Sequence, residues 1–150
     1  GETMEHEEIL KSLDTLLKGS HMGVTTFSDL LEHLQERSLR DQFRGYVKLF
    51  ENHEKAITKA ILFYHGQPDT ESIKIMMGEV MTSLKNLMLV GDKDVLNSAA
   101  KAIEMGLTQL REFDDKNLAV TEQVRKDVKI IHDDYEAMKH EIHKALMERE

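Results

Sequence analysis

The sequence predicts an all-α protein, a four-helix bundle with one additional helix, and three observations support this fold class. The 150 residues contain 32% charged residues, 40% hydrophobic residues and one proline, a composition typical of long amphipathic helices. Apolar residues recur at steps of three and four along five segments, the spacing of a helix face. No segment alternates apolar and polar residues as a strand does. One domain over residues 1–150 is expected, because this length can bury a substantial core.

The first predicted helix runs from about Glu5 to Glu36, with an apolar face that contains one polar residue, Ser20. Ser38 is expected to cap the second helix, with Asp41 at its third position accepting from backbone donors. Short connections between helices favour antiparallel neighbours, so the first two helices are expected to form a hairpin.

The second helix carries His53 and Glu54 at the centre of its apolar face, and Gly66 is expected to end it. Residues 67–70 contain the single proline and should make a turn and a new cap. A third helix then follows and is expected to end at Gly91.

Residues 92–94 begin the fourth predicted helix, and the polar stretch 114–117 ends it. The fifth helix continues to near the C-terminus. Its apolar face consists of Val124, Val128, Ile131, Tyr135, Met138, Ile142 and Leu146. The fourth and fifth helices are expected to form a second antiparallel hairpin.

Two seven-residue segments, 21–27 and 104–110, look like copies of each other. Each is followed by a helix with a histidine in the phase of its apolar face, His53 in the first case and His132 in the second. We interpret this pattern as a duplicated helical hairpin. The third helix would then supply the crossover connection between the two hairpins, which is the topology of ferritin-like bundles.

The runs 16–23, 50–56 and 130–133 resemble a bacterial family of ferritin-like four-helix bundles that is known only as a domain of unknown function. The resemblance extends over most of the chain, from about Ile9 to Leu146. It implies a ferritin-like antiparallel bundle of two repeated hairpins with an additional crossover helix. It does not imply a particular activity.

The wider ferritin-like superfamily binds two iron or manganese ions through glutamates and Glu-x-x-His motifs that project into the bundle. In this sequence the four corresponding carboxylate positions hold Ser20, Ile103, Phe50 and Lys129. None of these side chains replaces a carboxylate ligand. The resemblance therefore implies a degenerate dimetal site.

If this alignment is shifted by one residue, acidic and imidazole side chains occupy the ligand positions again. The candidate metal ligands are then His53, His132, His21 and Glu104, with Glu51 and Glu54 as further carboxylates. Such a site could bind iron, manganese or zinc. The alternative, which we favour, is that both His53 and His132 are interior or half-buried and bond to each other, to Ser20 or to water.

Gly23 and Gly106 occupy equivalent places in the two copies. Glycine inside a helix costs about 1 kcal/mol relative to alanine, so a packing reason is expected. We predict that the first and fourth helices approach closely at these glycines. The alternative is room for a small ligand in a cavity near Ser20 and Gly23.

The net charge of −8 argues against a nucleic-acid or membrane-binding protein, and cysteine is absent. No apolar run is long enough for a membrane span, and the acidic N-terminal residues do not resemble a signal peptide, so a cytoplasmic location is expected. The leading expectation is a non-enzymatic structural or interaction module without a cofactor. Such a module is expected to form a homodimer or a higher homo-oligomer through the third or first helix. The alternative is a metal-binding protein or weak oxidase that uses His53 and His132.

Overall fold

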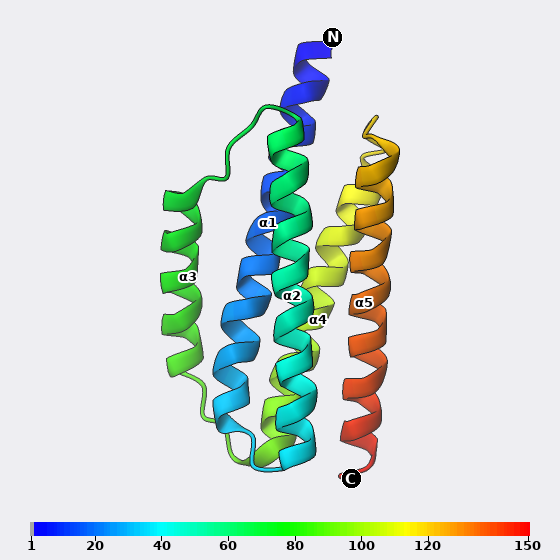
Figure 1. The fold of residues 1–150 in the computed structure, drawn as a ribbon. Helices are drawn as coiled ribbons and strands as arrows, with labels where there is room; N and C mark the ends of the chain where they lie inside the picture. The colour runs from blue at the N-terminus through cyan, green and yellow to red at the C-terminus, as the bar shows by residue number, and fades with distance from the viewer. Residues whose placement is uncertain (1) are drawn as a thin grey trace.

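Five α-helices make up most of the computed structural model, which describes residues 2–150 (Figure 1). They are α1 (Glu2–His33), α2 (Arg37–Phe63), α3 (Thr70–Lys85), α4 (Gly91–Asp115) and α5 (Glu122–Met147). The all-α class and the five helical segments predicted from the apolar periodicity are confirmed. No helix within residues 2–150 is long and apolar enough to cross a membrane.

The helices form two antiparallel hairpins, α1 with α2 and α4 with α5. The hairpins pack against each other through contacts of α1 with α4 and of α2 with α5. Helix α3 joins the two hairpins in sequence and returns along the length of the bundle beside α1. Helices α2 and α4 therefore run in the same direction (Figure 1). The four long helices therefore enclose a shared apolar core, to which α3 contributes Ile73 from its packing against α1.

Buried positions recur at a constant separation in the two hairpins. Adding 85 to the number of seven of the eight buried residues of α2 gives a buried residue of α5. The pairs are Leu39/Val124, Phe43/Val128, Tyr46/Ile131, Phe50/Tyr135, His53/Met138, Ile57/Ile142 and Ala60/Ala145. Adding 83 relates α1 to α4 in the same way, in the pairs Leu13/Leu96, Leu16/Ala99, Ser20/Ile103 and Phe27/Leu110. His53 thus corresponds to Met138, and the expected correspondence with His132 is wrong. The offset increases from 83 for the first helices of the hairpins to 85 for the second helices. Two additional residues therefore lie between α4 and α5, and no single offset aligns both helices.

The cap of α2 comes from a distant part of the chain. Asp92, in the first turn of α4, accepts hydrogen bonds from the backbone N–H of Gln35 at 2.7 Å and of Glu36 at 3.0 Å. Ser38 lies within α2, and the residue at the cap position, Glu36, makes no side-chain cap bond. The prediction of a Ser38 cap is therefore wrong. A carboxylate suits this place because the N-terminus of a helix carries unpaired N–H donors and a partial positive charge.

Other helix ends agree with the sequence in part. The carboxylate of Asp69 accepts from the backbone N–H of Ser72 at 3.1 Å, so the predicted cap of α3 is confirmed. Helix α2 ends at Phe63, and His65 adopts the left-handed conformation, with φ of 63°. Helix α3 ends at Lys85, and Gly91 instead begins α4 with φ of 80°.

Helix α3 packs against α1 and contacts no other helix of the described chain. Only two of its side chains, Ile73 and Leu84, are buried. Ile75 on its outer side is 66% exposed. The segment that follows α3 exposes more apolar surface, with Met88 at 89% and Val90 at 79%. The connection between the two hairpins is therefore the most weakly packed part of the fold.

Candidate functional site

His53 lies in the contact between α2 and α5 and is only 3% exposed. Its position belongs to the buried face of α2, which places the imidazole inside the bundle. The ring stacks on Tyr135, with centroids 5.9 Å apart, and meets Phe50 edge-on at 5.8 Å. Its Nε2 atom lies 2.8 Å from Oδ2 of Asp134. The centre of the bundle therefore holds one histidine among aromatic rings, tied to one carboxylate.

The contact with Asp134 determines the tautomer of His53. An Nε2–H group donates to the carboxylate, and Nδ1 is then an acceptor. Nδ1 is buried and has no hydrogen-bond partner. Burial lowers the pKa of His53, and the opposing effect of Asp134, which raises it, is smaller. The imidazole is accordingly neutral at pH 7, with one free lone pair inside the protein.

Two glycines make room for the aromatic rings beside His53. A Cβ atom at Gly23 would overlap the ring of Phe50, and one at Gly106 would overlap the ring of Tyr135. Helices α1 and α4 are in contact, but at these glycines the close approach is that of a ring on the partner helix of the same hairpin. A packing reason for the glycines was predicted, and the groups that need the space are rings of α2 and α5. Both glycines also line the same small void between α1 and α4.

The space near Ser20 and Gly23 is nearly filled. A void of about 20 Å³ remains between α1 and α4, which is room for one water molecule. The hydroxyl of Ser20 donates to the backbone carbonyl of Leu16 at 3.1 Å and does not reach a histidine. The structure thus has no cavity for a small organic ligand at the place suggested by the sequence.

His21 is paired with Glu54 across the first hairpin. The Nδ1 atom of His21 lies 3.2 Å from Oε2 of Glu54, and both side chains are about one quarter exposed, at 26% and 22%. Burial lowers the pKa of His21 and raises the pKa of Glu54, and the neighbouring Glu51 raises it further. These directions are opposite to those of an ion pair, so a neutral imidazole faces the carboxylate at pH 7.

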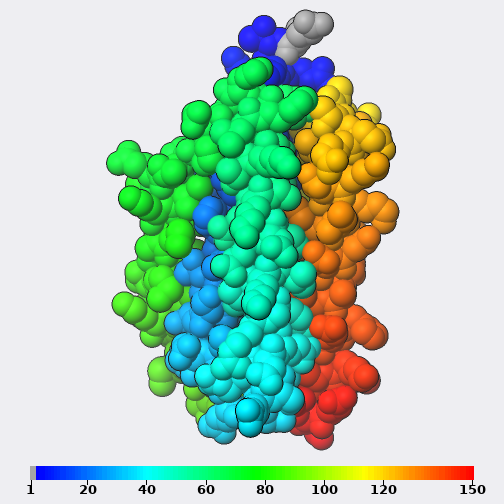
Figure 2. Space-filling model, in the orientation of Figure 1, coloured from blue at the N-terminus to red at the C-terminus, as the bar shows by residue number. Residues whose placement is uncertain are grey.

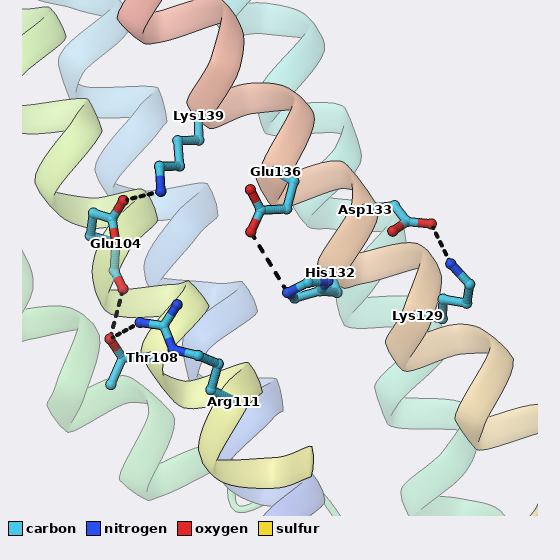
Figure 3. A network of polar contacts seen from close by, with 8 residues as sticks. All are labelled: Glu104, Thr108, Arg111, Lys129, His132, Asp133, Glu136 and Lys139. Carbon is cyan, nitrogen blue, oxygen red and sulfur yellow. Dashed lines mark hydrogen bonds and ion pairs between the residues drawn. The ribbon is translucent and has the colours of Figure 1, made fainter. Parts of the chain in front are cut away.

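The other two candidate ligands lie on the side of the bundle formed by α4 and α5 (Figure 3). Glu104 pairs with Lys139 at 2.9 Å, and this hydrogen bond lowers the pKa of the carboxyl group. His132 has a side chain that is 36% exposed and lies 3.8 Å from Glu136, one turn further along α5. His132 is therefore half-buried, one of the two placements expected for it, and it contacts Glu136 and not His53 or Ser20.

The structure does not bring the four predicted metal ligands together. His53 contacts Asp134, His21 contacts Glu54, Glu104 contacts Lys139, and His132 contacts Glu136. Within residues 2–150, no three side chains of His, Cys, Asp or Glu are grouped so that they could hold a metal ion. A dimetal site needs several carboxylates and imidazoles around one point, and here each candidate has its own separate partner.

Three polar contacts connect α2 with α5, and the sequence reasoning missed them. Besides His53 and Asp134, the Tyr46 hydroxyl donates to Oε1 of Glu141 at 2.6 Å. The Tyr64 hydroxyl accepts from the backbone N–H of Thr121 at 3.0 Å. Burial is the main cause that raises the pKa of Tyr46, with Glu141 adding to it. The partners lie far apart in sequence, so only the fold reveals these contacts.

A surface groove of about 660 Å³ lies between α2 and the start of α5. In Figure 2 it belongs to the upper part of the boundary between these two helices. Its lining comprises Lys55, Ala56, Lys59, Ala60 and Phe63 of α2, together with Thr121, Gln123, Val124 and Asp127. Small alanines on α2 leave the space that larger side chains would fill.

A comparison of the chain with known proteins finds no matching family model, no matching curated protein and no matching solved structure.

Proposed function

We propose that this chain is a ferritin-like helical bundle with a degenerate dimetal site, and that it acts as a non-enzymatic structural or interaction module. The observation that carries this proposal is the filling of the bundle centre by the rings of Phe50 and Tyr135. Each ring occupies space provided by a glycine, so the interior is closed by packing. A metal pair at this level would compete with two aromatic side chains for the same volume.

The order of the helices supports the ferritin-like part of the proposal. Two antiparallel hairpins are joined by a connection that returns along the bundle, which makes α2 and α4 parallel. One crossover of this kind distinguishes ferritin-like folds from simple up-and-down bundles. The recurrence of buried positions between the two hairpins is what a duplicated hairpin would give.

A second candidate function is metal binding or weak oxidase activity through His53 and His132. One observation favours it, namely the Nδ1 atom of His53, which is buried and has no partner. A free imidazole nitrogen is a ligand for iron, manganese or zinc. His132, however, does not contact His53. Its side chain lies near the carboxylate of Glu136, whereas His53 contacts Asp134. The interaction module is therefore the better supported function.

The interaction surface that we propose is α3 with the segment after it. Ile75, Leu87, Met88 and Val90 are all exposed, the last two almost completely. Exposed apolar groups that gather on one element are typical of protein contacts. We propose that a second copy of the chain covers them, which gives a homodimer or a higher homo-oligomer.

Metal analysis tests the choice between the two functions. Protein produced in medium supplemented with iron, manganese and zinc would be measured by elemental mass spectrometry, alongside His53→Ala and His132→Ala single variants and the double variant. We expect only trace metal, with equal amounts in all four proteins. Near-stoichiometric metal that is lost in the His53→Ala protein would overturn the proposal and justify oxidase assays.

A further inference from the structure

Polar contacts lie on either side of the residues that line the groove between α2 and α5. His53 meets Asp134 at 2.8 Å at one end, and Tyr64 accepts from the N–H of Thr121 at 3.0 Å at the other. These contacts are 11 residues apart on α2 (from 53 to 64), which is about 16 Å of helix. The volume of about 660 Å³ lies within the usual range of small-molecule sites. The groove therefore has the length and the volume of a binding site for a small molecule.

The floor of the groove is apolar. Ala60 and Val124 line it and are 6% and 3% exposed, so they belong to the same surface as the core. The ring of Phe63 stands at the groove with 63% of its surface exposed, and the adjacent Leu62 is 50% exposed. Such a concentration of exposed apolar surface on a highly charged protein is typical of a binding site.

One wall of the groove is basic. Lys55 and Lys59 line it from α2, and neither forms an ion pair with any residue of the described chain. Glu51 and Glu54 of the same helix lie within four residues of Lys55, so residues 51–63 carry no net charge. The positive charge in the groove comes from Lys55 and Lys59 alone.

The opposite wall has one acidic residue, Asp127, whose carboxylate accepts from the Gln123 side chain at 3.0 Å. A negative group in the groove would be repelled from this side and attracted to the lysines of α2. The chemistry of the groove thus combines an apolar floor with cationic groups along one edge only. This arrangement selects a ligand that has an apolar body and a negative charge at one end.

We propose that this groove binds a free anionic amphiphile, a long-chain carboxylate in which the head group pairs with Lys55 and Lys59. The alkyl chain lies on Ala56, Ala60 and Val124, and the ring of Phe63 covers it. The groove lining includes none of the four candidate metal ligands and no residue of α3, so this proposal does not depend on the proposed function.

Isothermal titration calorimetry of the full chain with dodecanoate tests the proposal, with dodecanol as the uncharged probe. We expect saturable binding of dodecanoate at one site and at least about tenfold weaker binding of dodecanol. A Lys55→Glu/Lys59→Glu variant should lose about tenfold or more in affinity for dodecanoate and keep its affinity for dodecanol. An Ala56→Phe variant, which fills the groove from its edge, should lose both ligands.

The matched control is Lys48→Glu/Lys74→Glu, which changes the net charge equally at two exposed lysines outside the groove. It should bind dodecanoate as the unmodified protein does. Equal losses in both double variants would show a general charge effect and overturn the proposal. So would an absence of saturable binding, binding to anionic phospholipid vesicles but not to dodecanoate, or capture of an acidic helical peptide in place of dodecanoate. Circular dichroism of each variant establishes that the bundle is intact.

Discussion

Phe50 and Tyr135 meet edge to face at the centre of the bundle, with ring centroids 5.6 Å apart and ring planes at 79°. This geometry is favoured for aromatic pairs because the positive edge of one ring faces the negative face of the other. The two residues occupy corresponding places in the two hairpins, and each fills the space opposite a glycine, Gly23 for Phe50 and Gly106 for Tyr135. Each hairpin therefore contributes one glycine and one aromatic ring that packs against it, and these two pairs fill the interior of the protein.

Replacement of Gly23 by alanine should destabilise the protein. The new Cβ atom would overlap the Phe50 ring, and overpacking typically costs about 1–3 kcal/mol, which exceeds the gain in helix propensity of about 1 kcal/mol. Gly45→Ala is the control, since no atom lies within 4 Å of its added Cβ, and it should stabilise by up to about 1 kcal/mol. Urea unfolding measures both, and a similar gain for both variants would refute the close packing at Phe50.

The removal of His53 should cost far more than the removal of His132. His53 is buried and bonded to Asp134, so His53→Ala should lower the free energy of unfolding by about 1–3 kcal/mol. His132 is partly exposed, and His132→Ala should change stability by no more than about 0.5 kcal/mol. Chemical denaturation of the two variants under identical conditions checks this difference. Equal costs would contradict the positions of the two imidazoles.

Stability should decrease as the pH falls below about 6.5. Burial lowers the pKa of His53 and of His21 from the ordinary value of 6.5, so the unfolded chain takes up protons before the folded protein does. The stabilisation is complete above the unfolded pKa and is lost as the pH decreases through the folded pKa. Urea midpoints between about pH 7.5 and 5.5 measure the effect.

The matched variant is His53→Met, which places at position 53 the residue type that stands at the corresponding position 138. It also removes the buried nitrogen that has no partner. The pH dependence should become shallower than that of the unmodified protein, with the remainder due mainly to His21. An unchanged slope would show that His53 does not titrate between the two states in this range.

Asp92 should be the residue that caps α2. Asp92→Ala removes the acceptor of the N–H groups of Gln35 and Glu36 and should cost about 1 kcal/mol, a typical value for a lost cap. Ser38→Ala, at the position that the sequence pattern suggests for the cap, should be nearly neutral. Thermal unfolding of the two variants compares them directly, and the reverse order would restore Ser38 as the cap.

The apolar segment after α3 should mediate self-association. A Met88→Glu/Val90→Glu variant places two charges on almost fully exposed positions, so it should leave the monomer folded and weaken the oligomer. Light scattering after size-exclusion chromatography, over a range of concentrations, measures the mass of both proteins. Met105→Glu is the control, because this residue is also exposed but lies on α4. A monomeric unmodified protein would reject this surface as a self-association site.

The helices could be predicted because their signal is local. Apolar residues at steps of three and four mark each buried face, and the polar stretch 114–117 marks the end of α4. The cap of α3 was predicted because its partner lies three residues away, as Asp69 and Ser72 show. The equally local cap of α5, in which Thr121 accepts from the N–H of Val124, was not predicted. The cap of α2 was missed because its acceptor, Asp92, is 56 and 57 residues from the donors.

The site was harder to predict because it depends on alignment between helices. The pairing of His53 with His132 was six residues away from Met138, the buried residue that corresponds to His53. One helical residue turns a side chain by about a quarter of a circle, so a small slip exchanges interior and surface. The groove was also missed, since Ala56 and Ala60 look like ordinary helix residues until the opposite helix is placed.

The attachment of α3 to a single neighbour has a consequence for how the molecule opens. Helix α3 can detach without breaking contacts among the other four helices, because α1 is its only helix partner within residues 2–150. Local opening of this kind lets amide hydrogens exchange at a low free-energy cost, whereas amides in the enclosed helices exchange only when the whole bundle unfolds. The chain thus contains two units of different cooperativity. A protease that cuts between the hairpins would leave two halves that remain associated through their shared core.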